Sequence, residues 1–223
     1  MPSSTVEQYI KTIYLLSERN RRNLVQMKEL AAAMTVTPGT ATSMVKHLSE
    51  RQLIHYLPRK GVELTPKGRS LALTMVRRHR LIETFLEQVL GYDWGEVHDD
   101  AERLEHAVSE RFVERIDVYL GHPDVDPHGD PIPSPEGTIE PWETYSLNRC
   151  LPGQRVEIRR VGNTDSEFLS LMKQYQVVPG EVFVLTDCNA VAGTLSLQHE
   201  HDRTLCTIGL DLSSRIQVAV LPE

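Results

Sequence analysis

Apolar side chains near the start of the chain recur at the spacing of two α-helices. The first helix is predicted over residues 4–18, where Ser4 followed by Glu7 has the spacing of a capping box. Residues 25–34 (VQMKELAAAM) are rich in helix formers and predict a second helix. The inward face of the first helix is expected to comprise Val6, Ile10, Ile13 and Tyr14.

A third helix and a β-hairpin follow. Residues 40–53 predict the helix, with Thr37 as its N-cap and Pro38 at its first position. Its inward side chains are expected to be Ala41, Met44, Val45 and Leu48. Residues 54–69 (IHYLPRKGVELTPKGR) place alternating apolar side chains on both sides of a Pro-Arg-Lys-Gly turn, which predicts a hairpin with a basic tip. Thr65 is expected to cap the next helix.

Beyond the hairpin, the pattern predicts two or three helices up to residue 120 and then a loop. Residues 121–137 hold five prolines and three glycines, a composition typical of an ordered loop or linker. From about residue 147, short alternating stretches predict a small β-barrel, interrupted by one helix at 166–175. The predicted strands are RVEIRRV, EVFVLTD, GTLSLQ, TLCTIGL and RIQVAVL. The fold class is therefore α+β.

Charge is divided unevenly along a chain whose formal net charge is −7. Residues 1–82 hold 14 Lys and Arg against 5 Asp and Glu, whereas residues 83–223 hold 10 against 26. Two short helices joined by a tight turn and followed by a basic hairpin form a winged helix-turn-helix pattern, in which the second helix enters the DNA major groove. The basic charge favours binding to double-stranded DNA. A tri-helical unit that contacts other proteins is the alternative.

The predicted DNA contacts lie mainly on the recognition helix and the hairpin. Hydroxyl and methyl groups at the N-terminus of that helix are expected to face base edges and phosphates, and the basic wing tip is expected to face phosphates. The candidate residues are Thr5, Thr37, Pro38, Gly39, Thr40, Ser43, Lys46, Arg59 and Lys60.

Composition argues against several other classes of protein. The N-terminus MPSSTVEQ lacks the charged-then-apolar pattern of a signal peptide, and no apolar run approaches the roughly 20 residues that span a bilayer. Cys150, Cys188 and Cys206 are an odd number of cysteines without CxxC spacing. We therefore expect a cytoplasmic protein with no membrane partner, no disulfide framework and no cysteine-only zinc site.

One short polar run, VHDDAERLEH at residues 97–106, concentrates ligand-type side chains. If the run is helical, each residue advances by about 100°, and His98, Glu102, Glu105 and His106 then fall on one face. That face lies beside a separate apolar stripe. The stripe consists of Val97, Ala101, Leu104, Val108 and Phe112. Because imidazole and carboxylate groups ligate Mn²⁺, Fe²⁺, Co²⁺ and Zn²⁺, the run predicts metal binding.

The four side chains extend over about 10 Å or more of helix, which is too far for one ion. His79 and Glu83 lie one helical turn apart in the preceding helix. If the two helices pack together, His98 joins His79 and Glu83 in one site, and the remaining three form another. A metallohydrolase or di-metal enzyme using the same clusters is the rival interpretation. However, Glu-x-x-His pairs and HExxH are absent from these stretches. A third interpretation, a metal-independent winged-helix regulator that senses an organic ligand, leaves the clusters unexplained.

The winged head and the two clusters together resemble the iron- and manganese-dependent repressors of the diphtheria toxin repressor family. The matching stretches are QYIKTIY, LTPKGR, RRHRLIETFL, HDDAERLEH and DPHGDPIP. The C-terminal strands look like the SH3-like (FeoA-like) domain of longer members. The resemblance implies a repressor without enzymatic activity or a small organic substrate. It also implies a homodimer, with its interface in residues 70–120, that binds palindromic operator DNA when loaded with metal.

The resemblance also implies two sets of ligands. The family's primary site combines one residue of the first helix with three of the HDDAERLEH run. Here the corresponding residues are Gln8, Glu102, Glu105 and His106. The ancillary site combines residues of both helices with the SH3-like domain. Its counterparts are His79, Glu83 and His98, with Asp165 and Glu167 of the segment NTDSEF as the expected completing donors.

Two positions bear on the identity of the metal. Glu102 stands where iron-type members have Cys, and Gln8 stands where iron-type members have Met and manganese-type members have Asp. The resulting donors are oxygen-rich and include no sulfur, which suits Mn²⁺, with Fe²⁺ as the alternative. Co²⁺ and Zn²⁺ are expected to bind in vitro, because their intrinsic affinity for such donors exceeds that of Mn²⁺.

These inferences divide the chain into three predicted domains. They are a winged helix-turn-helix domain at 1–72, a helical metal-binding and dimerisation domain at 73–141, and an SH3-like domain at 147–223. A metal held by Gln8 and by the dimerisation helices would fix the spacing of the two recognition helices, which half-sites on one face of DNA require.

Overall fold

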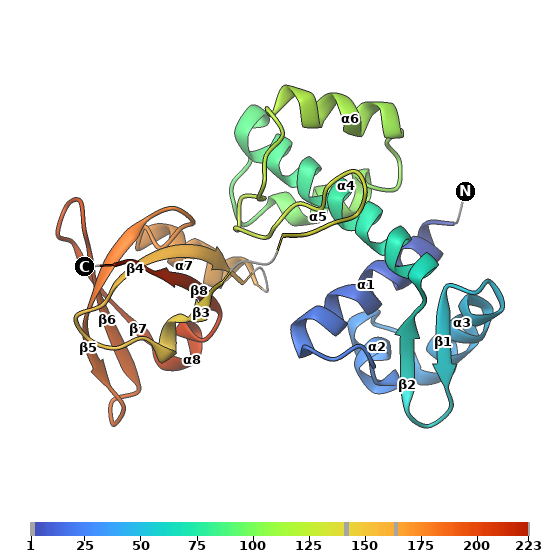
Figure 1. Cartoon of the computed structure of the whole chain (residues 1–223), viewed down its shortest axis with the longest axis horizontal. Helices are drawn as coiled ribbons and strands as arrows, with labels where there is room; N and C mark the ends of the chain where they lie inside the picture. The colour runs from blue at the N-terminus through green and yellow to red at the C-terminus, as the bar shows by residue number, and fades with distance from the viewer. Residues whose placement is uncertain (1–2, 141–142, 163–164, 223) are drawn as a thin grey trace. The chain divides into compact units, whose positions relative to one another are not determined.

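The computed structural model describes residues 3–140, 143–162 and 165–222. They form two compact units whose boundary falls inside one long helix, between Ile82 and Glu83. The first unit holds the N-terminal residues up to Ile82 together with Glu102–Arg115 and Ile132–Ile139, and the second holds the remaining segments. Figure 1 shows the elements in chain order. In the described part of the chain, no helix combines the length and apolarity that a membrane crossing requires.

The first unit begins with three helices and a hairpin, as the periodicity predicts. The helices are α1 (Ser4–Asn20), α2 (Met27–Ala33) and α3 (Pro38–Glu50), and the strands are β1 (Ile54–Leu57) and β2 (Gly61–Leu64). The predicted inward residues of α1 are all buried, and those of α3 are buried except Met44, which is partly buried. Thr37 caps α3, and the Thr65 hydroxyl accepts from the backbone N–H of Gly68 at the start of α4, so both predicted caps are confirmed.

Two local expectations at the start of the chain were wrong. Ser3, not Ser4, is the N-cap of α1, and its hydroxyl accepts from the backbone N–H of Val6. Neighbouring serines satisfy the same sequence rule, so only the backbone decides between them. Residues 25–26 also stay outside α2, because Val25 pairs with Val62 and adds a third strand-like segment to the hairpin.

The close approach of Val25 requires a glycine at the start of β2. A Cβ atom built on Gly61 would lie 2.2 Å from the carbonyl oxygen of Val25, and Gly61 has a φ of +147°. β1 and β2 pair antiparallel, with Ile54 opposite Leu64. The Pro-Arg-Lys turn therefore forms the predicted wing tip, with Arg59 and Lys60 exposed.

Three further helices follow the wing: α4 (Pro66–Leu90), α5 (Val97–Leu104) and α6 (Glu110–Tyr119). α5 ends at Leu104, so Glu105 and His106 lie in a turn and not on a helix. The predicted apolar stripe is therefore only partly correct. Val97 and Ala101 are buried, whereas Leu104, the last residue of α5, and Phe112, which belongs to α6, are 39% and 46% exposed.

The second unit contains a six-stranded antiparallel sheet with strand order β3-β8-β4-β5-β6-β7. In this order β3 and β7 are the edges, so the described strands form an open curved sheet and not a hydrogen-bonded ring (Figure 1). The strands are β3 (Tyr145–Ser146), β4 (Arg155–Val161), β5 (Val182–Asn189), β6 (Thr194–His199), β7 (Leu205–Gly209) and β8 (Ile216–Val220). The helices are η1 (Leu147–Arg149), α7 (Ser166–Gln174) and α8 (Leu210–Ser213).

The loop after α6 packs against this sheet within the same unit. The backbone N–H of Val161 in β4 donates to the carbonyl of His128, at 2.9 Å. Gly129 has a φ of +83°, and a Cβ atom there would lie 2.0 Å from the carbonyl oxygen of Arg159, so the loop and β4 are in close backbone contact. Trp94, which follows α4, belongs to the same hydrophobic core as the strands. This packing holds His128 and Gly129 against β4.

Candidate metal centre

The four predicted primary ligands lie together in the first unit. The Gln8 side-chain amide donates to Oε1 of Glu102 at 3.0 Å, and its carbonyl oxygen lies 3.3 Å from Nε2 of His106. The same Nε2 atom lies 3.4 Å from Oε1 of Glu105. Gln8 is on α1, Glu102 is on α5, and Glu105 and His106 are in the turn after it. The fold thus brings Gln8 to donors that follow it by 94 or more residues in the sequence.

Two neighbouring side chains hold this primary cluster in place. Oε2 of Glu7 lies 2.9 Å from Nδ1 of His106, and an Nδ1–H that donates to Glu7 would leave the lone pair of Nε2 for a cation beside Gln8 and Glu105. On the other side, Nζ of Lys11 lies 2.6 Å from Oε1 of Glu105. Sequence reasoning treated Glu7 as a capping residue and overlooked Lys11. The available signal was the position of Lys11, a charged residue, among the inward-facing residues of the first helix.

Glu105 is fully buried, and its ionisation is decided by that burial together with its contacts to His79 and Lys11. Burial opposes the carboxylate form, but the hydrogen bond from His79 and the Lys11 ammonium outweigh burial and lower the pKa of Glu105 below its usual value. The group is therefore a carboxylate at neutral pH. A charged oxygen donor, a second carboxylate, an amide oxygen and an imidazole suit a hard divalent cation.

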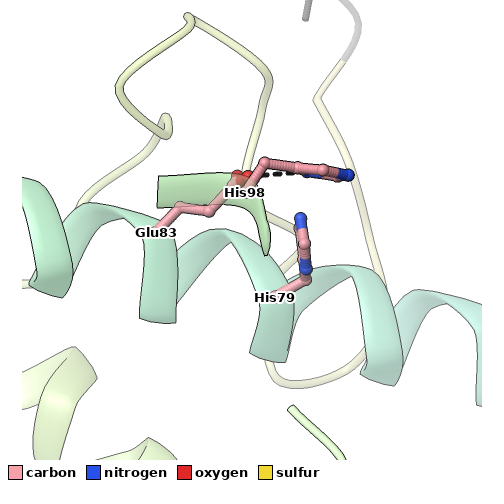
Figure 2. Close-up of side chains that lie close together, drawn as sticks. All are labelled: His79, Glu83 and His98. Atoms are coloured by element: carbon pink, nitrogen blue, oxygen red, sulfur yellow. Dashed lines mark hydrogen bonds and ion pairs between the residues drawn. The ribbon is translucent and has the colours of Figure 1, made fainter. Parts of the chain in front are cut away.

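The three predicted ancillary residues form a second cluster. His79 and Glu83 lie one turn apart on α4, and His98 on α5 reaches Glu83, with Nδ1 3.2 Å from Oε1 (Figure 2). One ligand atom from each of the three residues lies within 4.8 Å of the other two. The interhelical packing assumed from the sequence is therefore present.

A third cluster, which sequence reasoning missed, shares Glu83 with the second. Ligand atoms of Glu83, Asp126 and His128 lie within 4.8 Å of one another, and all three residues are buried. Asp126 and His128 belong to the DPHG stretch, which had been read only as a linker. The available signal was a histidine and an aspartate two residues apart in an ordered loop. A loop has no regular periodicity, so the sequence could not indicate that these side chains lie beside Glu83.

The surroundings of His128 fix the orientation of its ring and leave Nδ1 available to bind a metal. Its Nε2–H donates to the carbonyl of Trp94 at 3.1 Å, and its ring stacks on the Trp94 ring with 5.2 Å between centroids. Burial lowers the pKa of His128, so the imidazole is neutral. Its Nδ1 is buried and has no hydrogen-bond partner among the described residues. An orphaned lone pair beside two buried carboxylates fits a metal ion, which would supply the missing partner.

The predicted donors Asp165 and Glu167 are placed differently. Asp165 is the N-cap of α7, where one oxygen accepts from the backbone N–H of Phe168 and the other pairs with Arg215 at 2.9 Å. Glu167 is exposed on the same helix. Neither belongs to a ligand cluster in the described part of the chain. Their role as ligands stays a prediction.

All the candidate DNA contacts are exposed in the first unit, on the N-terminal end of α1, on α3 and at the wing tip. The hydroxyl of Thr37 accepts from the backbone N–H of Thr40, and the hydroxyl of Ser43 donates to the carbonyl of Gly39. These internal bonds hold the first turn of α3 and leave its outer surface open to a partner.

Comparison with known proteins decides the family. Three family models match successive stretches: the iron dependent repressor N-terminal DNA binding domain at 1–62, the iron dependent repressor metal binding and dimerisation domain at 65–134, and the FeoA domain at 145–220. A solved manganese-dependent transcriptional repressor in complex with manganese superposes with a TM-score of 0.88 and 34% identity, covering 97% of this chain and 100% of that one. The chain belongs to the iron-dependent repressor family.

Curated members of the repressor family resemble the chain over somewhat more than half of its length. The diphtheria toxin repressor of Corynebacterium glutamicum is 35% identical over 130 residues, which are 58% of this chain and 56% of that protein. The transcriptional regulator MntR of Bacillus pumilus is 34% identical over 116 residues, or 52% of this chain and 78% of that protein. The match therefore spans about half the length of the curated diphtheria toxin repressor. These relatives are transcriptional regulators, which favours the repressor interpretation over the metallohydrolase one.

Proposed function

We propose that the protein is a transcriptional repressor that binds operator DNA as a homodimer when a divalent metal occupies its ligand clusters. The observation that carries the proposal is the contact of Gln8, on α1, with Glu102 and His106. Ile10 and Ile13 of the same helix lie in the core of the winged head. α1 therefore connects the cluster to the DNA-binding surface through one rigid element.

The side chains around the cluster determine how metal binding affects α1. A bound divalent cation would supply a positive charge that Gln8, Glu102, Glu105 and His106 can all coordinate. Glu7 fixes the tautomer of His106, and the buried Glu105 carboxylate anchors the turn after α5. These contacts hold α1 in one position. Because α1 packs in the core of the winged head, they also keep α3 in the orientation that an operator half-site requires.

We propose Mn²⁺ as the physiological ion, with Fe²⁺ as the alternative. Support comes from the oxygen-rich primary donors and from the manganese-dependent repressors among the similar structures. A solved structure of ScaR with bound Zn²⁺ is also similar, with a TM-score of 0.78 and 30% identity. Co²⁺ and Zn²⁺ are therefore expected to bind in vitro.

For the ancillary site we propose His79, Glu83 and His98, extended by Asp126 and His128 through the shared Glu83. The earlier assignment of Asp165 and Glu167 as completing donors remains a competing proposal. In the described structure Asp165 is engaged by Arg215, whereas Nδ1 of His128 lacks a partner, which favours His128.

We further propose three functional divisions of the chain and a cytoplasmic location. Residues 1–72 bind DNA, residues 73–141 bind metal and dimerise, and residues 147–223 form the SH3-like domain. Dimerisation through the helices is supported by exposed apolar side chains on α4 and α6. They are Leu90, Phe112, Val118 and Tyr119, with exposures from 46% to 69%.

The test is operator binding with and without metal. A palindromic operator would be selected from random duplexes in Mn²⁺, and its affinity then measured by gel retardation in Mn²⁺ and in excess chelator. We expect binding only with metal, and a steep fall in affinity with salt. Replacing Arg59 with Ala should reduce the salt slope by about one phosphate contact. Equal affinity in chelator and in Mn²⁺ would rule the proposal out.

A further inference from the structure

Lys11 is a buried cation inside the primary cluster. It is only 2% exposed, although lysine is almost never fully buried unless it is paired. Its Nζ lies 2.6 Å from Oε1 of Glu105, 3.5 Å from Oε1 of Glu102 and 3.5 Å from Nδ1 of His79. The ammonium thus lies against two carboxylates that are potential metal ligands, and beside the His79 ring.

The cluster has a second, separate convergence of donors. On that side the carbonyl oxygen of Gln8 lies 3.3 Å from Nε2 of His106, which lies 3.4 Å from Oε1 of Glu105. Glu102 borders both sides, because its Oε1 also accepts from the Gln8 amide at 3.0 Å. Glu102 and Glu105 therefore stand between two positions suited to a cation, and the lysine ammonium fills one of them.

We infer that Lys11 is a built-in counter-cation that restricts the primary cluster to a single divalent ion. The inference rests on the proposed function, since it takes Gln8, Glu102, Glu105 and His106 as ligands. Two carboxylates that bridge two cation positions are the usual framework of a two-metal site. Here the second position is occupied by a group that the chain itself supplies and that cannot dissociate.

Charge explains why the ammonium excludes a second ion. Glu7, Glu102 and Glu105 carry three negative charges, which Lys11 and one divalent ion balance. A second divalent ion would leave an excess of two positive charges in a site where Lys11 and Glu105 are shielded from water. Like charges in such surroundings repel strongly, and the ammonium could not leave without losing its own buried partner.

Replacing Lys11 with Glu should therefore convert the site into a two-ion site. The carboxylate removes the positive charge and adds a third bridging-type donor at the same position. Lys11→Gln is the milder second variant, because it removes the charge but keeps a hydrogen-bond donor toward Glu105. Lys28→Glu is the matched control, since Lys28 is exposed on α2 and the charge change is identical.

Metal stoichiometry would be measured in the full chain. His98→Ala and His128→Ala would be introduced as a common background, so that the other two clusters do not bind Mn²⁺. Equilibrium dialysis counts the ions, and electron paramagnetic resonance separates isolated Mn²⁺ from exchange-coupled pairs. Circular dichroism melting verifies that each variant is folded.

We expect about one equivalent of uncoupled Mn²⁺ in the background protein and in the Lys28→Glu control. We expect about two equivalents with a coupled spectrum in Lys11→Glu, and a weaker second ion in Lys11→Gln. A coupled pair in the background protein would overturn the inference. So would a single equivalent in both folded Lys11 variants.

Operator binding by the unsubstituted protein distinguishes this inference from the proposed function. One bound ion with no effect of Mn²⁺ on operator affinity would reject metal-activated repression and leave the role of Lys11 intact. A coupled pair combined with Mn²⁺-dependent operator binding would reject the role of Lys11 and leave the repressor function intact.

Discussion

Nδ1 of His79 lies 2.5 Å from Oε2 of Glu105, so a proposed ancillary ligand is hydrogen-bonded directly to a proposed primary ligand. In this arrangement Nδ1–H donates to the Glu105 carboxylate. The lone pair of Nε2 is then left for a metal, as in carboxylate–histidine–metal arrangements. The two sites therefore share a side-chain contact and are not independent.

This contact predicts that Glu105→Gln weakens both sites. The primary site loses a charged ligand, and the ancillary site loses the group that orients His79. We expect ancillary affinity for Mn²⁺ to fall by roughly 10- to 100-fold, the usual effect of removing a hydrogen-bond partner of a metal-bound histidine. Isothermal titration calorimetry would measure both affinities, with Glu114→Gln, an exposed substitution on α6, as control.

Glu105→Gln also leaves the buried Lys11 ammonium without its closest partner, at a cost of about 3 kcal/mol of stability. Combining it with Lys11→Met removes that charge and separates the effect on folding from the effect on metal. An unchanged ancillary affinity in the folded double variant would show that the contact does not couple the sites.

Selectivity for manganese is predicted to depend on Glu102. Glu102→Cys replaces a hard oxygen donor with a soft, shorter thiolate, which favours Fe²⁺, Co²⁺ and Zn²⁺ over Mn²⁺. We expect Mn²⁺-activated operator binding to weaken by roughly tenfold or more, whereas activation by Co²⁺ or Fe²⁺ is retained. His106→Ala is the comparison, because it removes a ligand for every metal and should abolish all activation. Native Mn²⁺ activation in Glu102→Cys would mean that Glu102 is not a ligand.

Trp94 provides an optical test of the third cluster. Its ring stacks on His128, so a metal ion on Nδ1 of His128 is expected to change its fluorescence. A Trp142→Phe background makes Trp94 the sole tryptophan, since the chain has two. We expect the metal-dependent change to disappear in His128→Ala and to persist in Asp165→Ala. The opposite pattern would restore Asp165 as the completing ligand and reject Asp126 and His128.

His199 in the SH3-like sheet is predicted to make stability depend on pH. Hydrogen bonding to Glu181 at 2.7 Å and to Asp202 at 3.0 Å raises the pKa of His199. The stabilisation from a raised pKa is fully present below the unfolded value of about 6.5, and is lost as pH rises through the higher folded value. His199→Gln should thus cost about 1–3 kcal/mol near pH 5.5 and less near pH 8.5.

Urea unfolding at the two pH values measures that difference, with the exposed His201→Gln as control. A loss in His199→Gln that stays constant, or grows, as pH rises would contradict the assignment of a charged imidazole between the two carboxylates.

Local sequence determined the helices, the wing and most of the strands. Apolar spacing and caps such as Thr37 involve only a few neighbouring residues, so they can be recognised in the sequence without knowledge of the tertiary structure. The family resemblance supplied Gln8 as a partner of Glu102, which periodicity by itself does not indicate. Where local rules were ambiguous, as between Ser3 and Ser4, they gave the wrong residue.

Only the tertiary structure decided which polar groups meet. A helical projection placed Glu105 and His106 on one face of a helix, but α5 ends before them, and the turn that follows brings His106 to Gln8 and Glu105 to Lys11. Lys11 reads as a solvated charge in sequence, and it is the packing of α1 against the turn that makes it a buried cation. His128 lies in a loop without periodicity, and its orphaned Nδ1 results from docking onto Trp94 and β4. Long-range packing fixes the protonation and partners of such groups, so the residues alone specify the ligand types and the fold specifies the sites.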